Sequence, residues 1–339
     1  MAGVVAKYLS ELCEGFGNGW NRFWFTPTHP LTLGVLRVAV GSMALYVVAT
    51  YGFDLVRWFG PGGMLPSSVI EETASIDLVS GRPVSDFRPS YLFLAHSSAE
   101  LWACHIVSLI VLVLFTLGLW TRITSALALV VILSYIHRAL MLTAELEPIL
   151  VLVMAYVCLG SLFFGSGPAP LSLDRRRARR NETAEAAEAR HRDPLADRSV
   201  AATIAVRLVQ VHLSVVYLMM GLAKLAEPST AEEPGVWWFG DGIWWLIAKP
   251  DGPLVDFTGL HDNIYVLNTW THSIVLFEIA FGILIWNRLA RPLLLALAVP
   301  MWISLALVTG LVPFCSMMLI ANLAFVAPQS LAGCCSRCK

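Results

Sequence analysis

The hydrophobic positions of this sequence form long runs, each bounded by charged residues, proline or glycine. A helix needs about 20 mainly apolar residues to cross roughly 30 Å of hydrocarbon, and eight runs have about that length. Only the region of Gly310 separates the last two, so seven and eight spans both remain open. The pattern predicts an all-α polytopic membrane protein. Its predicted spans are 31–50, 101–118, 122–142, 149–165, 202–225, 264–286, 289–309 and 312–328.

The segments outside these spans divide the chain. Residues 1–30 are amphipathic and aromatic, too polar for a signal peptide, and favour a retained segment lying at the membrane interface. Residues 31–328 form the predicted transmembrane domain, with a charged linker at about 166–200, and 329–339 form a cysteine-rich tail. The outer loops carry acidic residues and tryptophan pairs, which predicts interfacial helices there.

Composition supports the same interpretation. Hydrophobic residues make up 57% of the chain and charged residues 14%, with a mean hydropathy of +0.69, values typical of a protein in a lipid bilayer. A formal net charge of −1 offers no basic field for nucleic acid. Seven cysteines, an odd number, argue against a secreted disulfide scaffold. Cys334, Cys335 and Cys338 suit palmitoylation or metal binding in an oligomer, but a reduced, inert tail is favoured.

Lysine and arginine residues set the predicted orientation, because short loops rich in them stay cytoplasmic. With the N-terminus inside, 15 of the 23 cationic side chains fall in inner segments and four in outer segments. Eight of the 15 are arginines of the 166–200 linker, where a topology signal is favoured over a patch for anionic lipid or nucleotide. Both termini are therefore predicted to be cytoplasmic, and a bacterial cytoplasmic membrane is the expected location.

Lys224 is the most informative charge within a predicted span. It lies near the outer end of 202–225, and helical spacing places Gln210, Tyr217, Met220 and Gly221 on or beside its face. Such a strip can line a pocket for a flat apolar ligand, while the alternative is helix packing through Gly221 and its neighbour Ala223. Apolar surroundings favour the neutral form of a lysine, which can act as a base.

Other ionisable groups are predicted at a similar depth in the outer half of the membrane. Each histidine is more often a packed or interfacial residue than a catalyst, so the cluster stays a hypothesis. Its members are His137, Arg138, Glu145, Glu147 and His272.

Four further groups within spans have simpler expected roles. Arg37 and Arg207 lie about two turns from inner helix ends and are expected to snorkel to the cytoplasmic surface. Glu278 is expected to pair with a cation on a neighbouring helix, with a structural pair and a catalytic role both open. His212 points away from the face that carries the predicted base and is expected in the core.

The sequence carries no His-x-x-x-His or Glu-x-x-His metal signature, no glycine-rich phosphate loop and no nucleophile elbow. No metal is therefore predicted.

Several short motifs resemble the HTTM (horizontally transferred transmembrane) domain family, which includes the membrane part of vitamin K-dependent gamma-carboxylase. The most specific stretch is similar to the family's Gly-x-x-Lys-Leu pattern followed by tryptophan and glycine. The resembling segments are Tyr217-Leu-Met-Met-Gly-Leu-Ala-Lys-Leu225, Gly235-Val-Trp-Trp-Phe-Gly-Asp-Gly242, Leu171-Ser-Leu-Asp174, Gly118-Leu-Trp-Thr-Arg122 and Phe277-Glu278.

The resemblance implies that Lys224 deprotonates a reduced, vitamin K- or menaquinone-like quinone and so initiates oxygenation and carboxylation chemistry. Glu147 and Arg138 are expected to assist catalysis. The expected quinol-binding residues are Tyr217, Met220, Gly221, His137 and His272.

The sequence departs from the family pattern where histidines are usual, reading Glu145-Leu-Glu147 and Met301-Trp-Ile-Ser304 instead. A second hypothesis is therefore a non-catalytic quinone- or lipid-binding or transport protein that keeps the fold without the chemistry. A small-molecule transporter is third, without visible inverted repeats. The predicted partners are the lipid bilayer and an isoprenoid quinol.

Overall fold

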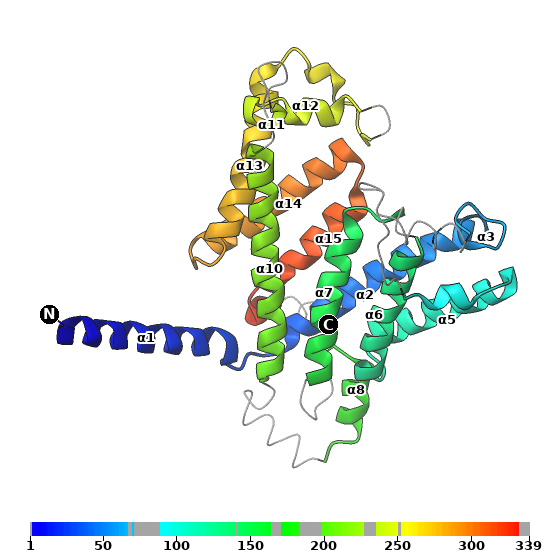
Figure 1. Cartoon of the computed structure of the whole chain (residues 1–339), viewed down its shortest axis with the longest axis horizontal. Helices are drawn as coiled ribbons and strands as arrows, with labels where there is room; N and C mark the ends of the chain where they lie inside the picture. Colours follow the sequence, from blue (N-terminus) through cyan, green and yellow to red (C-terminus); the bar gives the residue numbers. More distant parts are fainter. Residues whose placement is uncertain are drawn as a thin grey trace. The chain divides into compact units, whose positions relative to one another are not determined.

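A computed structural model describes residues 2–66, 70, 89–139, 142–163, 171–183, 198–226, 235–249 and 252–331. Regular secondary structure in these ranges is helical, apart from one isolated bridge between Thr28 and Ser199 (Figure 1). The helical class predicted from the hydrophobic pattern is thus confirmed for this part of the chain. The tail cysteines, most of the acidic outer loop and much of the arginine-rich linker lie outside the described residues.

Six helices in the described ranges are long and apolar enough to cross a membrane, as in a multi-pass integral membrane protein. They are α2 (Leu31–Tyr51) continued through η1 (Gly52–Asp54) and α3 (Leu55–Phe59), α5 (Ser98–Leu117), α7 (Leu146–Phe163), α10 (Val200–Leu225), α13 (Ile264–Leu284) and α14 (Ala290–Thr309).

The two other predicted spans, 122–142 and 312–328, contain helices that are too short or not apolar enough to count among these six. Charged and hydroxyl residues, including Arg122 and Arg138, lower the hydropathy of α6 (Thr121–Arg138). Gly310 ends α14 in the left-handed region at φ 71°, and α15 (Val312–Asn322) that follows has only 11 residues. The structure therefore separates the last two helices at Gly310, and the predicted number of about eight spans is not confirmed.

The remaining helices are short or lie outside the apolar set. α1 exposes aromatic side chains such as Phe16 and Trp20 on its surface, in keeping with its predicted amphipathic character. Their bounds are α1 (Ala2–Phe25), η2 (Tyr91–Leu94), α8 (Leu173–Arg180), α11 (Val236–Phe239), α12 (Gly242–Ile247), η4 (Thr258–Leu260) and η5 (Leu323–Phe325).

The chain forms two compact units, which are described separately. Unit 1 comprises 1–143, 151–208 and 327–339, and unit 2 comprises 144–150 and 209–326. Unit 1 is organised around the packing of α2 against α5, where a Cβ on Gly41 would meet the side chains of Thr116 and Phe115. The close approach of these two backbones therefore requires a residue without a side chain.

In unit 1, Asp174 ties α8 to the start of α6. Its carboxylate accepts hydrogen bonds from the backbone N–H groups of Trp120 (3.1 Å) and Thr121 (3.0 Å) and from the Thr121 hydroxyl (2.9 Å). The carboxylate also lies where the helix dipole of α6 favours negative charge. Asp174 of the Leu171–Asp174 motif thus caps α6, the helix that begins within the Gly118–Arg122 motif. Neither motif alone predicts this contact.

Arg37 is buried beneath this junction. Its Nη2 donates to the carbonyl oxygen of Leu171 at 2.9 Å, and Asp174 is close enough to interact electrostatically. Gly118, at φ 72°, leaves room for the guanidinium, since a Cβ there would lie 2.6 Å from Arg37 Nη1. With only 1% of Arg37 exposed, the expectation that it snorkels to water is wrong, because its guanidinium is buried against Leu171, just before α8, and interacts with Asp174.

Replacing Asp174 by alanine is expected to lower the free energy of unfolding by about 1–2 kcal/mol, since three charge-assisted hydrogen bonds are lost from a partly exposed site. Denaturant unfolding in detergent, followed by circular dichroism, measures the change. Asp262→Ala is the control, because Asp262 is exposed and its ion pair is with the neighbouring His261. Equal stability of D174A and D262A would contradict the capping role.

Unit 2 is built on the antiparallel contact of α10 with α13. A Cβ on Gly221 would lie 2.7 Å from Ile279 Cγ1, and one on Gly282 would lie 2.9 Å from the carbonyl oxygen of Ser214 and 2.8 Å from Leu218 Cβ. These two glycines therefore let the two backbones approach closely.

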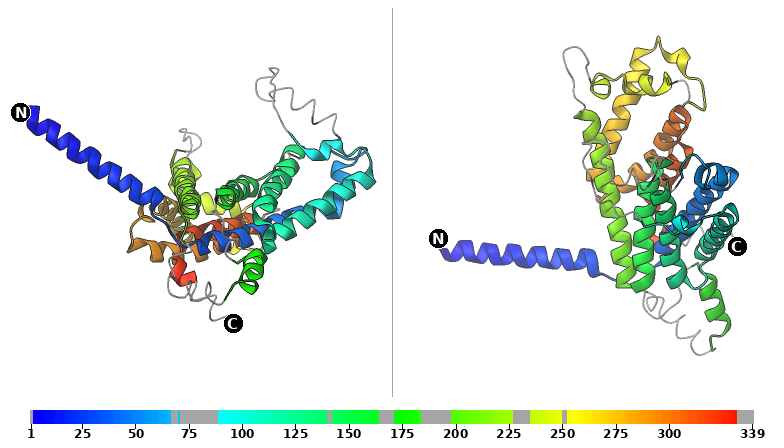
Figure 2. Two further views of the ribbon diagram at one scale, coloured as in Figure 1. Left: turned by 90° about the horizontal axis from the view of Figure 1, so that it is seen from below. Right: turned by 45° about the vertical axis from the view of Figure 1, so that its right-hand side comes forward.

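The remaining helices of unit 2 pack around this pair. α14 packs against α13 and α15, and Figures 1 and 2 show α12 lying across the end of α13. The tryptophan-rich segment thus contains the short helices α11 and α12, where Trp238 and Trp245 are exposed.

Candidate functional site

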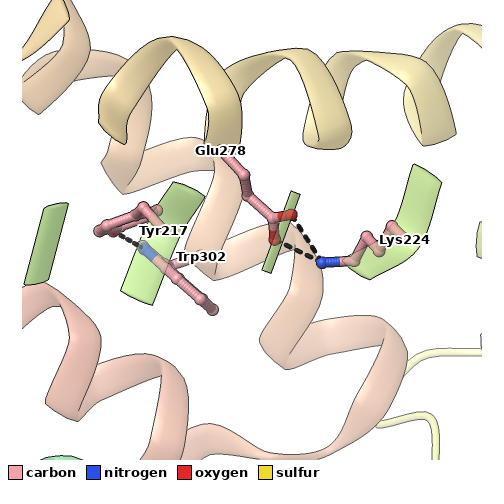
Figure 3. A network of polar contacts seen from close by, with 4 residues as sticks. All are labelled: Tyr217, Lys224, Glu278 and Trp302. Atoms are coloured by element: carbon pink, nitrogen blue, oxygen red, sulfur yellow. Dashed lines mark hydrogen bonds and ion pairs between the residues drawn. The ribbon is translucent and has the colours of Figure 1, made fainter. Parts of the chain in front are cut away.

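The candidate site of unit 2 centres on an ion pair between α10 and α13. Lys224 Nζ donates to both carboxylate oxygens of Glu278, at 2.6 Å and 2.7 Å (Figure 3). The Lys224 side chain is 18% exposed and that of Glu278 is 0% exposed. The prediction that Glu278 pairs with a cation on a neighbouring helix is confirmed, and the cation is the predicted base itself.

Trp237 of α11 lies against the same ammonium group. Lys224 Nζ is 5.0 Å from the centroid of the indole ring, within the range of a cation–π interaction. The ring in turn packs on the backbone at Gly242, where a Cβ would come within 2.6 Å of it. The lysine therefore lies between a buried carboxylate and a flat aromatic surface, and both come from segments that sequence analysis had singled out.

Tyr217, two turns before the lysine, is fully buried. Its hydroxyl oxygen accepts a hydrogen bond from Trp302 Nε1 at 2.6 Å (Figure 3). It accepts a second one from Asn322 Nδ2 at 2.9 Å. Its ring stacks on Phe281, with centroids 3.9 Å apart. Tyr217 therefore joins α10 to α13, α14 and α15, and its polar group is already occupied by protein donors.

The other residues on the predicted face of α10 have mixed positions. Gln210 is buried and donates to the carbonyl oxygen of Ala324 at 2.7 Å. Gly221 packs against α13, as the packing alternative predicted, whereas its proposed companion Ala223 is exposed. Met220 is half-buried, and His212 is exposed, so the expectation of a core position for His212 is wrong.

His272 links α13 to α11 in unit 2. Its Nδ1 lies 2.8 Å from the carbonyl oxygen of Asn268 and its Nε2 lies 3.1 Å from that of Trp238. Both contacts are hydrogen bonds only when the imidazole carries two protons, because a carbonyl oxygen can only accept. His272 thus bridges α13 and the segment that carries Trp237, and its predicted part in quinol binding stays a prediction.

Glu147 binds the turn before its own helix. Its Oε2 accepts a hydrogen bond from the backbone N–H of Ala144 at 2.8 Å, and its side chain is buried at the N-terminus of α7. This contact ties the turn that precedes α7 to the first turn of the helix. It is sufficient to explain a buried carboxylate at this position, and the catalytic role of Glu147 stays a prediction.

Arg138 and His137 belong to unit 1. Arg138 is buried between the rings of Phe59 and Phe93, at 5.7 Å and 5.4 Å, and its Nη2 donates to the carbonyl oxygen of Phe59 at 3.2 Å. Its Nη1 has no hydrogen-bond partner in the described part of the chain. His137 Nδ1 lies 2.9 Å from the carbonyl oxygen of Pro89. Their predicted participation in the quinol site stays a prediction.

A buried polar cluster in unit 1 escaped sequence analysis. His105 Nδ1 lies 2.7 Å from the hydroxyl oxygen of Tyr135, and the Tyr91 and Ser108 hydroxyl oxygens lie 2.5 Å apart. Burial raises the pKa of Tyr91 to about 12, so its phenol stays protonated at neutral pH. The available signal was the polar pair His105 and Ser108, one turn apart in an otherwise apolar span.

Among the described residues, no group of three or more histidine, cysteine, aspartate or glutamate side chains is placed to hold a metal ion. No protein-family model, curated protein or solved structure matches this chain. The resemblance to the HTTM family therefore stays a prediction, and a function must be argued from the geometry of the site.

Proposed function

We propose that this chain is an integral membrane, carboxylase-like enzyme that binds an isoprenoid quinol and transfers its proton to the Lys224–Glu278 pair. One observation carries the proposal: a fully buried carboxylate within an apolar helix contact is held by a lysine that is itself partly accessible. Ionisable groups inside a membrane domain are costly, and a buried ion pair is a poor source of stability. The presence of this pair therefore favours a chemical role.

The surroundings of the pair fit a quinol ring. The indole of Trp237 offers a flat apolar face beside Lys224 Nζ, and the ammonium and carboxylate offer a donor and an acceptor for a hydroxyl group. Lys224 and Trp237 would hold the ring, and Gly221 and Met220 of α10 lie beside them. When bound, the quinol would supply the reducing electrons for reaction with oxygen.

The geometry favours the pair as the base, rather than the lysine alone. A protonated lysine cannot accept a further proton, so one must go to Glu278, directly or by transfer from Lys224 Nζ across the 2.6 Å hydrogen bond. The pair then holds an ammonium and a neutral carboxylic acid. The ammonium charge is positioned to stabilise the oxygen that gave up the proton.

Oxygen uptake and epoxide formation with menaquinol, in membranes that contain the full chain, test this proposal. E278Q and the double variant K224M/E278M are expected to lower turnover at least about 100-fold, the usual size of a lost acid–base group. Lys249→Met is the matched control, because Lys249 is an exposed lysine of the same unit, and its turnover is expected to be unchanged. Wild-type turnover in K224M/E278M would refute the proposal.

The proposal includes the membrane topology. The excess of cationic residues in alternate loops supports cytoplasmic termini and a bacterial cytoplasmic membrane. Cysteine-accessibility labelling in intact cells tests it at Asp262 and Arg288, exposed positions at opposite ends of α13. A cysteine at 262 is expected to react with an impermeant maleimide, whereas one at 288 is expected to stay protected. The reverse pattern would contradict the orientation.

The second candidate is a non-catalytic quinone- or lipid-binding protein. The saturation of the site by its own residues favours it, because Glu278 is fully paired and the Tyr217 hydroxyl is occupied by Trp302 and Asn322. Mass spectrometry of lipids that co-purify with the full chain, combined with oxygen uptake, separates the two functions. Retained quinone without quinol-dependent oxygen uptake would support binding alone.

A further inference from the structure

The junction between α6 and α8 in unit 1 holds two residues in an unusual backbone conformation. In the described ranges, Trp120 (φ 47°) and Leu171 (φ 55°) are the non-glycine residues with positive φ, a region that side chains with a Cβ rarely adopt. Both side chains are large, apolar and exposed, at 68% and 46%. The junction therefore directs two apolar side chains outward at a local energetic cost.

Next to them, α8 presents arginines on one face. Leu173, Arg176, Arg177 and Arg180 follow the spacing of one helical face, and the three arginines are exposed. A surface pocket of about 560 Å³ opens between α8 and the start of α6. It is lined by Leu119, Leu173, Arg176, Arg177, Arg179 and Arg180. Guanidinium groups and leucine side chains thus share one hollow.

This arginine face is held in place. Ser172 caps α8 by accepting from the backbone N–H of Arg175 at 3.0 Å, and Asp174 binds the start of α6. Arg37 holds the carbonyl oxygen of Leu171 from below. A ligand at this face would therefore meet arginines whose helix is already ordered, which lowers the entropic cost of binding.

We propose that this junction binds the phosphate group of an anionic phospholipid. Arg176, Arg177 and Arg180 take the phosphate oxygens, since guanidinium groups suit phosphate geometry. Trp120 and Leu171 lie among the upper acyl chains and glycerol groups of the same leaflet, a position that tryptophan favours. The apolar residues in and beside the pocket favour a lipid over a free phosphate or a nucleotide.

The position of the junction supports a lipid ligand. α8 lies beside the start of α6 (Figure 1). A short turn separates this start of α6 from the end of the apolar helix α5. That turn, Gly118 to Trp120, is where the chain leaves a helix long enough to cross the membrane. A headgroup at that depth reaches the arginines while its acyl chains run along the apolar helices.

Thermal unfolding of the purified full chain in detergent, with equal concentrations of three additives, tests the proposal. Dioleoylphosphatidylglycerol is expected to raise the unfolding temperature by a few degrees, because it binds the folded state. Dioleoylphosphatidylcholine and sodium phosphate are expected to raise it much less. An equal shift with sodium phosphate would overturn the assignment of a lipid, and an equal shift with phosphatidylcholine would overturn the role of net negative charge.

Two variants test whether the rise in unfolding temperature with phosphatidylglycerol comes from this junction. R176Q/R180Q is expected to lose most of the shift with phosphatidylglycerol, whereas the charge-matched control R22Q/R288Q, two exposed arginines elsewhere, is expected to keep it. Trp120→Gly relieves the positive φ, so its unfolding temperature without lipid is expected to be unchanged or higher while its response to phosphatidylglycerol falls. A full response in R176Q/R180Q or in W120G would overturn the proposed site.

Discussion

Replacing Lys224 by methionine is expected to lower the free energy of unfolding by about 3–5 kcal/mol, because it leaves a buried carboxylate without its counterion. Glu278 is 0% exposed, and Lys224 is the cation within hydrogen-bond distance of both its oxygens. Protonation of the orphaned acid reduces the loss, so K224M should be least destabilised at low pH. Denaturant unfolding in detergent at several pH values measures both effects.

The double variant K224M/E278M shows whether the instability of K224M comes from the unpaired carboxylate or from the loss of the lysine side chain itself. Replacing both partners by apolar residues removes the unpaired charge, and such exchanges are often neutral or stabilising. We therefore expect K224M/E278M to recover most of the stability that K224M loses, and K249M to match the wild type. A K224M/E278M variant as unstable as K224M would mean that Lys224 contributes mainly through packing against Trp237.

This cycle also separates folding from chemistry. Loss of turnover in K224M alone has two explanations, a missing base and an unfolded protein. If the K224M/E278M chain is folded but has no turnover, the missing base is the explanation that is left. The most useful test of the proposed enzyme is thus the variant that removes both charges, a choice that depends on the contact between α10 and α13.

The sequence predicted the helical class and identified Lys224 as the candidate base because both inferences depend on local patterns. Apolar runs identify membrane helices whatever their partners, and a lysine in such a run is conspicuous on energetic grounds. The sequence predicted that Glu278 pairs with a cation on a neighbouring helix but did not identify that cation, because the order in which the helices pack was unknown. Packing of Gly221 and Gly282 across the contact identifies α10 as that helix.

The junction between α6 and α8 shows what local sequence patterns cannot predict. Arg37 was expected to reach water because it lies near a helix end, yet it is buried and donates to the carbonyl oxygen of Leu171, 134 residues later. The two short motifs that include Gly118 and Asp174 were each weak as sequence signals. Their structural role depends on hydrogen bonds between positions 53 and 54 residues apart. The periodicity of a helix or a strand cannot predict contacts over such a separation.

Tyr217→Phe is expected to lower the free energy of unfolding by about 2–4 kcal/mol, although it removes a single oxygen atom. Two buried donors, Trp302 Nε1 and Asn322 Nδ2, would lose their shared acceptor, and each unsatisfied buried group costs about 1–3 kcal/mol. The stacking of the ring on Phe281 is retained, so the loss reports the hydroxyl group alone. Unfolding in detergent, as for the lysine variants, measures it.

Tyr265→Phe supplies the control, because Tyr265 lies on α13 with 89% of its surface exposed and should tolerate the change without effect. Combining Y217F with Trp302→Phe removes one of the two stranded donors, so the double variant should cost less than the sum of the single ones. Strict additivity would show that the hydroxyl and indole act independently. Sub-additivity would establish that Tyr217 and Trp302 form a shared network between α10 and α14.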